Sequence, residues 1–445
     1  MDSAQDLHNR ARRRIACRLL PFIFFLYLVA MIDRFNVSFA ALRMKTDLGF
    51  SDTIYCLGAS LFFVTYVLFE IPGAIVAERW SVRKWTARIM LSWGVITILT
   101  AYIQNAREFY LARLLLGTAE ASFFPSIIIY LTRWFAAKDR ARAIAVFYTA
   151  SPISAFVGSA LAGWLLPIHW MGLSGWRWLF IMEGFPAVVL GAITLFYLTD
   201  YPAEAEWLPD PERAAITTVL TSESAARAKH GSLGFRAAVK DSRLLLIMTG
   251  YFFYILAFVT NTLWMPTFLQ RLSNLPPAAV ARFVMFPALA GVAGLLLNSW
   301  FADSSGEHKW HAVVPMIAGG GCYLAIGVFA GNFAAALLLF TLFYLFSTSA
   351  FPSIWAIPTM FLSETAAAAA FGLINSIGQT GGFFGPSIVG LLNDRTHSIH
   401  SSLIFIASSM LLSAFTLSFL KSVSPIRGKS LDLQSSVAFE PDVTS

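Results

Sequence analysis

The stretch LLPFIFFLYLVAMIDRFN, residues 19–36, carries a carboxylate and a guanidinium directly after fourteen uncharged, mostly apolar residues. A helix that takes Asp33 and Arg34 into hydrocarbon meets a large desolvation cost unless the charges pair, face water or handle a solute. The stretch therefore indicates a membrane-spanning helix whose two charges pair, face water or bind a solute. Other charged residues inside predicted spans are candidates for the same site.

Composition places the rest of the chain in a lipid bilayer as well. Of the 445 residues, 57% are hydrophobic and 13% are charged, whereas about a quarter of residues are charged in soluble proteins. Uncharged stretches of the roughly 20 residues that a spanning helix needs occur at 143–168, 244–270, 283–302, 312–363, 365–393 and 401–420. The longest stretch holds two helices. Five more segments begin near residues 19, 53, 85, 109 and 177, which gives twelve predicted spans.

The distribution of positive charge predicts the topology. Of the 32 Lys and Arg residues, 23 fall in the two tails and in alternate loops, so both termini are expected in the cytoplasm of a multi-pass inner (plasma) membrane protein. The positive-inside distribution then explains the net charge of +7, which is therefore no indication of a nucleic-acid partner. The predicted organisation is a tail (1–18), a six-helix half (19–199), a cytoplasmic linker (200–242), a second six-helix half (243–421) and a tail (422–445).

An internal repeat supports two equivalent halves. Residues 124–127 (FPSI) recur as residues 351–354, an offset of 227, and Gly158 and Gly163 match Gly385 and Gly390 at that offset. Because each half crosses the membrane an even number of times, the pseudo-two-fold axis should lie along the membrane normal, with a solute site near the midplane between the halves. The loop with Glu78, Arg79 and Arg83 has a weaker echo at Asp303.

The ionisable residues predicted inside spans all lie in the first half: Asp33, Arg34, Glu70, Arg113, Glu120 and Glu183. Asp33 and Glu120 are candidate proton carriers, since a nearby guanidinium balances the effect of burial on a carboxylate. Arg34 keeps its proton and offers a planar fork of donors, which suits an anion. Arg113, two turns before Glu120 on the same face, would complete the array. A structural ion-pair network is the alternative, and it is favoured for Glu70 and Glu183.

The remaining motifs argue against an enzyme. The sequence shows no nucleotide-binding loop, zinc spacing or nucleophile elbow, and the three cysteines have no metal or redox spacing, so no metal or cofactor is expected. Polar and aromatic residues within the spans are candidates to line a cavity, although Asn and Gln also join helices. These residues are Tyr66, Asn261, Trp264, Trp355, Asn375 and Gln379.

The chain resembles the major facilitator superfamily, specifically its anion:cation symporters, over nearly all of residues 19–420. The residues that carry the resemblance are Asp33-Arg34-Phe35-Asn36 with Ala40, Arg113 to Gly117 to Glu120-Ala121, Trp176-Arg177-Trp178 with Glu183-Gly184, Pro202 through Trp207-Leu208, and Asn375-Ser376-Ile377-Gly378. Ala74, Ser81, Glu78 and Ser304 depart from the superfamily's loop pattern, which bears on the cytoplasmic gate and not on the class.

The resemblance implies a monomeric carrier that takes up a small organic anion, such as tartrate, a sugar acid or an aromatic acid, together with protons. Asp33 and Glu120 would carry protons, Arg34 would hold the substrate, and Asn36 would join the charge network with Arg113. Tyr66, Asn375 and Gln379 would line a hydrated cavity shared with these charges. Two alternatives stay open: an electroneutral organic-anion exchanger or facilitator, and a non-transporting membrane sensor.

Overall fold

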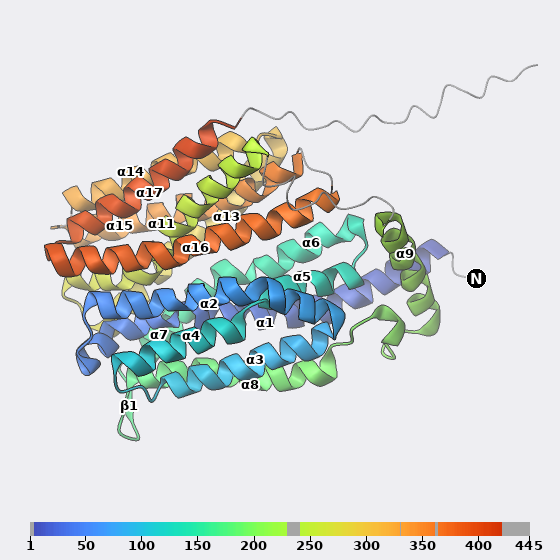
Figure 1. Cartoon of the computed structure of the whole chain (residues 1–445), viewed down its shortest axis with the longest axis horizontal. Helices are drawn as coiled ribbons and strands as arrows, with labels where there is room; N and C mark the ends of the chain where they lie inside the picture. Colours follow the sequence, from blue (N-terminus) through green and yellow to red (C-terminus); the bar gives the residue numbers. More distant parts are fainter. Residues whose placement is uncertain (1–3, 229–240, 330, 361–363, 421–445) are drawn as a thin grey trace, which may run out of the picture.

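The computed structural model describes residues 4–228, 241–329, 331–360 and 364–420, and this part of the chain is almost entirely helical (Figure 1). The elements of the first half are α1 (Ala4–Leu48), α2 (Asp52–Arg79), α3 (Val82–Thr100), α4 (Ala106–Glu120), α5 (Phe123–Trp134), α6 (Ala137–Tyr148), α7 (Ala150–Leu165), β1 (His169–Trp170), β2 (Leu173–Ser174) and α8 (Gly175–Tyr197). The linker contributes η1 (Pro202–Glu204) and α9 (Asp210–Ala228).

The second half contains α11 (Ser242–Ser273), α12 (Pro277–Phe283), α13 (Met285–Ser305), α14 (Lys309–Val328), α15 (Phe333–Ala356), η2 (Ile357–Met360), α16 (Glu364–Thr396) and α17 (Ile399–Ser418). Within the described residues, ten segments are long and apolar enough to cross a membrane. Together with α3 and α16 they make the twelve spans that the sequence predicts. Figure 1 shows the two halves side by side, with α16 of the second half next to α2 of the first.

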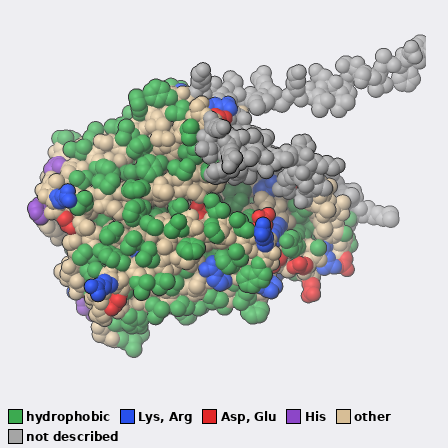
Figure 2. Space-filling view, in the orientation of Figure 1, with side chains coloured by type: hydrophobic (Ala, Val, Ile, Leu, Met, Phe, Trp, Pro, Cys, Tyr) green, Lys and Arg blue, Asp and Glu red, His purple; other side chains and the backbone are tan. Residues whose placement is uncertain are grey.

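The two ends of the bundle differ. We call the end that carries the short antiparallel pair β1–β2 the hairpin end, and the end that carries the amino terminus and α9 the linker end (Figure 1). Between them, hydrophobic side chains cover much of the visible face and charged side chains are sparse over its middle (Figure 2). This is the surface that a bilayer requires.

Three local features differ from the sequence prediction or fall outside it. Residues 4–18, predicted as a tail, continue α1 as helix. Tyr197 Oη at the end of α8 donates to the Arg18 carbonyl at 3.1 Å, and Arg14 pairs with Glu212 of the linker helix α9. The linker itself forms the helix α9. The predicted tail 422–445 lies outside the described residues.

The fourth span is interrupted directly after Glu120, one of the two candidate proton carriers. α4 ends at Glu120 and α5 begins at Phe123, because Ser122 between them adopts a left-handed backbone with φ of 69°. Trp85 Nε1 donates to Ser122 Oγ at 2.9 Å, and Gly73 of α2 packs so closely on Ser122 that a Cβ would lie 2.3 Å from this oxygen. Contacts with α2 and α3 therefore stabilise the break between α4 and α5, and Glu120 is the last residue of α4.

Candidate functional site

Arg34 of α1 and Glu120 of α4 form an ion pair inside the first half. Arg34 Nε donates to Glu120 Oε1 at 2.8 Å, and Nη2 makes a second bond to the same oxygen. Glu120 is fully buried and the Arg34 side chain is 11% exposed. The other carboxylate oxygen, Oε2, has no hydrogen-bond partner among the described residues. In this state the Arg34 guanidinium is therefore already paired with an anion, the carboxylate of Glu120.

Asp33 lies in a separate enclosure formed by α1 and α3. Its Oδ1 accepts from Asn36 Nδ2 at 2.7 Å, and its Oδ2 accepts from Thr97 Oγ1 at 2.7 Å and from Trp93 Nε1. Consecutive residues on a helix point about 100° apart, which sends the Asp33 and Arg34 side chains to different neighbours. The expectation that both side chains share one hydrated cavity is therefore wrong for this state, since Asp33 is fully buried behind three donors.

Arg113 connects the two enclosures electrostatically. It is buried on α4 and interacts with both Asp33 and Glu120. Its guanidinium lies 5.0 Å from the centroid of the Phe62 ring, and that of Arg34 lies 5.6 Å from the same ring. Two cations thus share one aromatic ring, and the acids on either side keep the cluster near neutrality.

The predicted lining residues Tyr66, Asn375 and Gln379 lie on α2 and α16, two helices that meet between the halves. The Arg34 guanidinium lies 4.8 Å from the Tyr66 ring centroid, and Gln379 Nε2 approaches Asn375 Oδ1 at 3.4 Å. One turn beyond Tyr66, Glu70 Oε1 accepts from Asn375 Nδ2 at 2.7 Å. The sequence favours a structural role for Glu70, and the structure gives this carboxylate direct contacts with the second half.

These contacts belong to a longer seam along which α2 and α16 run antiparallel. From the hairpin end inward, the paired positions are Asp52 with Asp394, Cys56 with Gly390, Phe63 with Gly382 and Glu70 with Asn375. A Cβ on Gly390 would lie 2.6 Å from that of Cys56, and one on Gly382 would lie 2.7 Å from the Phe63 ring. Such close packing closes the seam from the hairpin end to Glu70.

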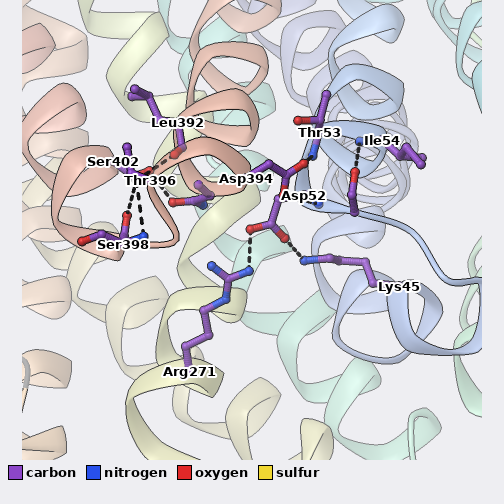
Figure 3. A network of polar contacts seen from close by, with 12 residues as sticks. Lys45, Asp52, Thr53, Ile54, Arg271, Leu392, Asp394, Thr396, Ser398 and Ser402 are labelled. Carbon is purple, nitrogen blue, oxygen red and sulfur yellow. Dashed lines mark hydrogen bonds and ion pairs between the residues drawn. The ribbon is translucent and has the colours of Figure 1, made fainter.

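An ionic network covers the outer rim of this seam (Figure 3). Asp52 of α2 pairs with Lys45 of α1 and with Arg271 of α11, so one carboxylate joins the two halves. The Asp394 carboxylate of α16 accepts from the backbone N–H groups of Asp52 and Thr53 at 3.2 and 2.8 Å. It thereby caps the amino terminus of α2 from the opposite half.

The remaining predicted residues lie at the linker end. The Glu78 carbonyl accepts from Arg133 Nη2 at 2.8 Å, and the Arg83 backbone N–H donates to the Asp200 carboxylate at 3.0 Å. Arg79 and Asp303 are exposed. Asp200, which also accepts from Ser81, organises the loop after α2, a role that the sequence does not reveal.

A separate cavity lies between the halves on another face of α1. Its lining is mainly apolar, with Met31 and Phe35 on one side and Met265 and Tyr344 on the other. Arg34 does not line it. Within the described part of the chain, no group of three or more His, Cys, Asp or Glu is placed to hold a metal ion.

Sequence reasoning missed the donors of Asp33 and the ionic rim. A signal for the donors exists, because Thr86, Trp93, Thr97 and Thr100 form one buried helical stripe on α3. Asp52 and Asp394 carry no such signal, since charges just beyond a span ordinarily mark its end.

Comparison with known proteins agrees with this architecture. The family model described as "Major Facilitator Superfamily" matches residues 23–386. A "Putative tartrate transporter" of Agrobacterium vitis is 40% identical over 425 residues, covering 95% of this chain and 97% of its own. A "Quinolone resistance transporter" of Acinetobacter baumannii is 34% identical, covering 91% and 94%.

Among solved structures, a bacterial homologue of the human lysosomal transporter Spinster superposes with a TM-score of 0.72 at 16% identity, covering 92% of this chain and 95% of its own. The fold predicted from the sequence, an all-α membrane protein of twelve spans in two six-helix halves, is thus confirmed. This chain belongs to the Major Facilitator Superfamily, as a multi-pass membrane transporter of the type of the anion:cation symporters.

Proposed function

We propose that the protein takes up a small organic anion together with protons, by alternating access of one site between its two halves. The observation that carries this proposal is the occupation of Arg34 by Glu120. A substrate carboxylate competes with Glu120 for the same fork of donors, and hydrogen bonds to charged groups are worth about 1.5–3 kcal/mol each. Protonating Glu120 weakens its hold on Arg34, so proton and anion load together.

Asp33 would be the second proton carrier. Its enclosure exchanges protons only when α1 and α3 open, because Asn36, Thr97 and Trp93 occupy its oxygens. Arg113 acts on both acids, which supports one charge network. The neutralised network would then permit the halves to rock against each other.

Tyr66, Asn375 and Gln379 would complete the substrate site, since they face Arg34 or one another between α2 and α16. The tartrate name of a 40% identical relative supports a carboxylate substrate. We further propose that the linker end faces the cytoplasm of an inner membrane, that the protein works as a monomer, and that the loop with Glu78, Arg79, Arg83 and Asp303 gates that end.

Transport by reconstituted protein tests the proposal. Proteoliposomes with an acidic exterior are expected to accumulate radiolabelled tartrate or another carboxylate found by a thermal-shift screen. Glu120→Gln, which mimics the protonated acid, should keep counterflow and lose pH-driven accumulation. Asp33→Asn should lose accumulation as well, and Arg34→Ala should lose substrate binding.

The alternatives predict other outcomes. Counterflow that needs no pH gradient and ignores Asp33→Asn would support an electroneutral exchanger or facilitator. Binding without flux would support a sensor. Accumulation equal to that of the wild type in all three variants would disprove the proton-coupled mechanism.

A further inference from the structure

Glu183 of α8 is a buried carboxyl group that the mechanism above does not use. It is 4% exposed, and within the described residues neither of its oxygens has a hydrogen-bond partner. α8 packs tightly along α3: a Cβ on Gly184 would lie 2.7 Å from the Gly94 carbonyl oxygen. An ionised carboxylate without an ion-pair partner would lose its hydration in such packing, and no counter-charge would compensate for that loss.

The negative charge of Asp33 makes the ionised form of Glu183 still less favourable. Two side chains of α1 interact with Glu183: the Asp33 carboxylate, which is a like charge, and the Asn36 amide, which is a hydrogen-bonding group. On α3, the polar groups of Trp93 and Thr97 are committed to Asp33. Arg113 is the cation that acts on Asp33 from α4. In this part of the described chain Glu183 therefore faces a like charge, and two carboxylates in one dry site do not both stay ionised.

Asn36 has an unmet requirement of its own. Its Nδ2 donates to Asp33 Oδ1 at 2.7 Å, while its Oδ1 has no donor among the described residues. Rotating the amide by half a turn would bring Oδ1 against the Asp33 carboxylate, which sets two acceptors face to face. Asp33 thus fixes the orientation of the Asn36 amide, and Asn36 Oδ1 is a buried acceptor without a donor among the described residues.

We propose that Glu183 carries a proton, donates it in a hydrogen bond to Asn36 Oδ1, and in this way holds the Asn36 amide on Asp33. One proton then satisfies the Asn36 oxygen and removes the buried charge of Glu183. Glu183 acts through Asn36, so it is a positioning residue for Asp33. The functional part of this inference rests on the proposed role of Asp33 in proton coupling, whereas the protonation of Glu183 does not.

Glu183→Gln and Glu183→Met separate a neutral donor from an ionised acid. Gln has a similar shape and can donate to Asn36 Oδ1, so pH-driven accumulation and its pH profile are expected to stay within about twofold of the wild type. Met fills the space without a donor. Accumulation should then shift toward higher pH by about one unit, because Asp33 with a poorly held donor keeps its proton more firmly.

Infrared spectroscopy of the purified protein at neutral pH tests the proton directly and needs no transport. In the carbonyl region of buried protonated carboxylic acids, one component is expected in the wild type and in the matched control Glu70→Gln and should be missing from Glu183→Gln, while any component from Asp33 or Glu120 stays in all three. Size-exclusion chromatography first confirms that each protein compared is folded. The infrared test does not use Glu183→Met, so its result remains valid even if that variant fails to fold.

Three results would overturn the inference: Glu183→Gln has the same carbonyl region as the wild type, Glu183→Gln abolishes accumulation as Asp33→Asn does, or a folded Glu183→Met keeps the wild-type pH profile. Failure of anion transport by the wild type would instead count against the proposed function, with the infrared result still decisive for Glu183.

Discussion

Asp33 and Arg34 are adjacent in the sequence and yet belong to two different polar clusters. Asp33 is held by donors of α1 and α3, and Arg34 is held by Glu120 of α4. The helical rotation between neighbours separates a carboxylate held by three donors from a guanidinium paired with a second carboxylate. One dipeptide therefore supplies a sheltered acid and an anion-binding cation without their neutralising each other.

Arg34→Lys is expected to weaken substrate binding at least about tenfold, because lysine keeps the charge and loses the fork of two donors. Isothermal titration with the carboxylate found by the thermal-shift screen measures the effect. Arg43→Lys is the matched control, since Arg43 forms an ion pair with Asp47 one turn along α1 at a half-exposed position. Equal affinity of Arg34→Lys and the wild type would contradict a bidentate role.

At the scale of elements, the pair α3–α8 shows how small residues set the packing of the first half. Gly94 and Gly184 face each other so closely that a Cβ on Gly94 would lie 2.8 Å from the Gly184 carbonyl oxygen. Since that obstacle is backbone, the helices must move apart to admit a side chain. Trp93 and Glu183 are the sequence neighbours of these two glycines, and both interact with Asp33.

Gly184→Ala is expected to lower the stability of the protein by about 1–3 kcal/mol through this overpacking. Thermal unfolding in detergent would record it as a lower midpoint. Gly321→Ala serves as the control, because a Cβ at this position in α14 meets nothing within 4 Å. The control should be neutral or slightly stabilising, and a loss of equal size in both variants would show that the α3–α8 contact has no special weight.

The sequence predicts the spans, the two halves and most of the charged cluster, because apolar length and embedded charge are local properties. It does not predict the break at Ser122, since Trp85 and Gly73 impose this left-handed residue from neighbouring helices. It also places Asp33 and Arg34 in one cavity, which the structure corrects. Separating them requires knowing that α3 supplies Trp93 to one side of α1, and that is a matter of tertiary packing.

At the scale of the whole molecule, the α2–α16 seam and its ionic rim hold the hairpin end shut. Asp52 is the junction, with Lys45 from its own half and Arg271 from the other. The Arg271 side chain is 41% exposed, so this pair contributes less than a fully buried one would. A rim of this kind closes the path without making the closed state permanent.

Asp52→Asn is expected to open the hairpin end more often, and the native Cys56 reports this because it is a free, buried thiol packed against Gly390. With Cys17 and Cys322 replaced by Ser, labelling of Cys56 by a maleimide should accelerate about tenfold, which corresponds to ~1.4 kcal/mol. Asp47→Asn is the control, because Asp47 accepts from Trp176 within the first half. Unchanged labelling of Asp52→Asn would remove the rim from the gating mechanism.

The single register of the seam has a genetic consequence. Asp52 meets Asp394 and Glu70 meets Asn375 on the same pair of helices. Deleting one residue of α2 between Phe63 and Glu70 would swing Glu70 about 100° around the helix axis and leave the rim in register. Frame-preserving deletions in that short interval would therefore yield proteins that keep the contacts of the rim at the hairpin end but have lost the Glu70–Asn375 hydrogen bond between their halves.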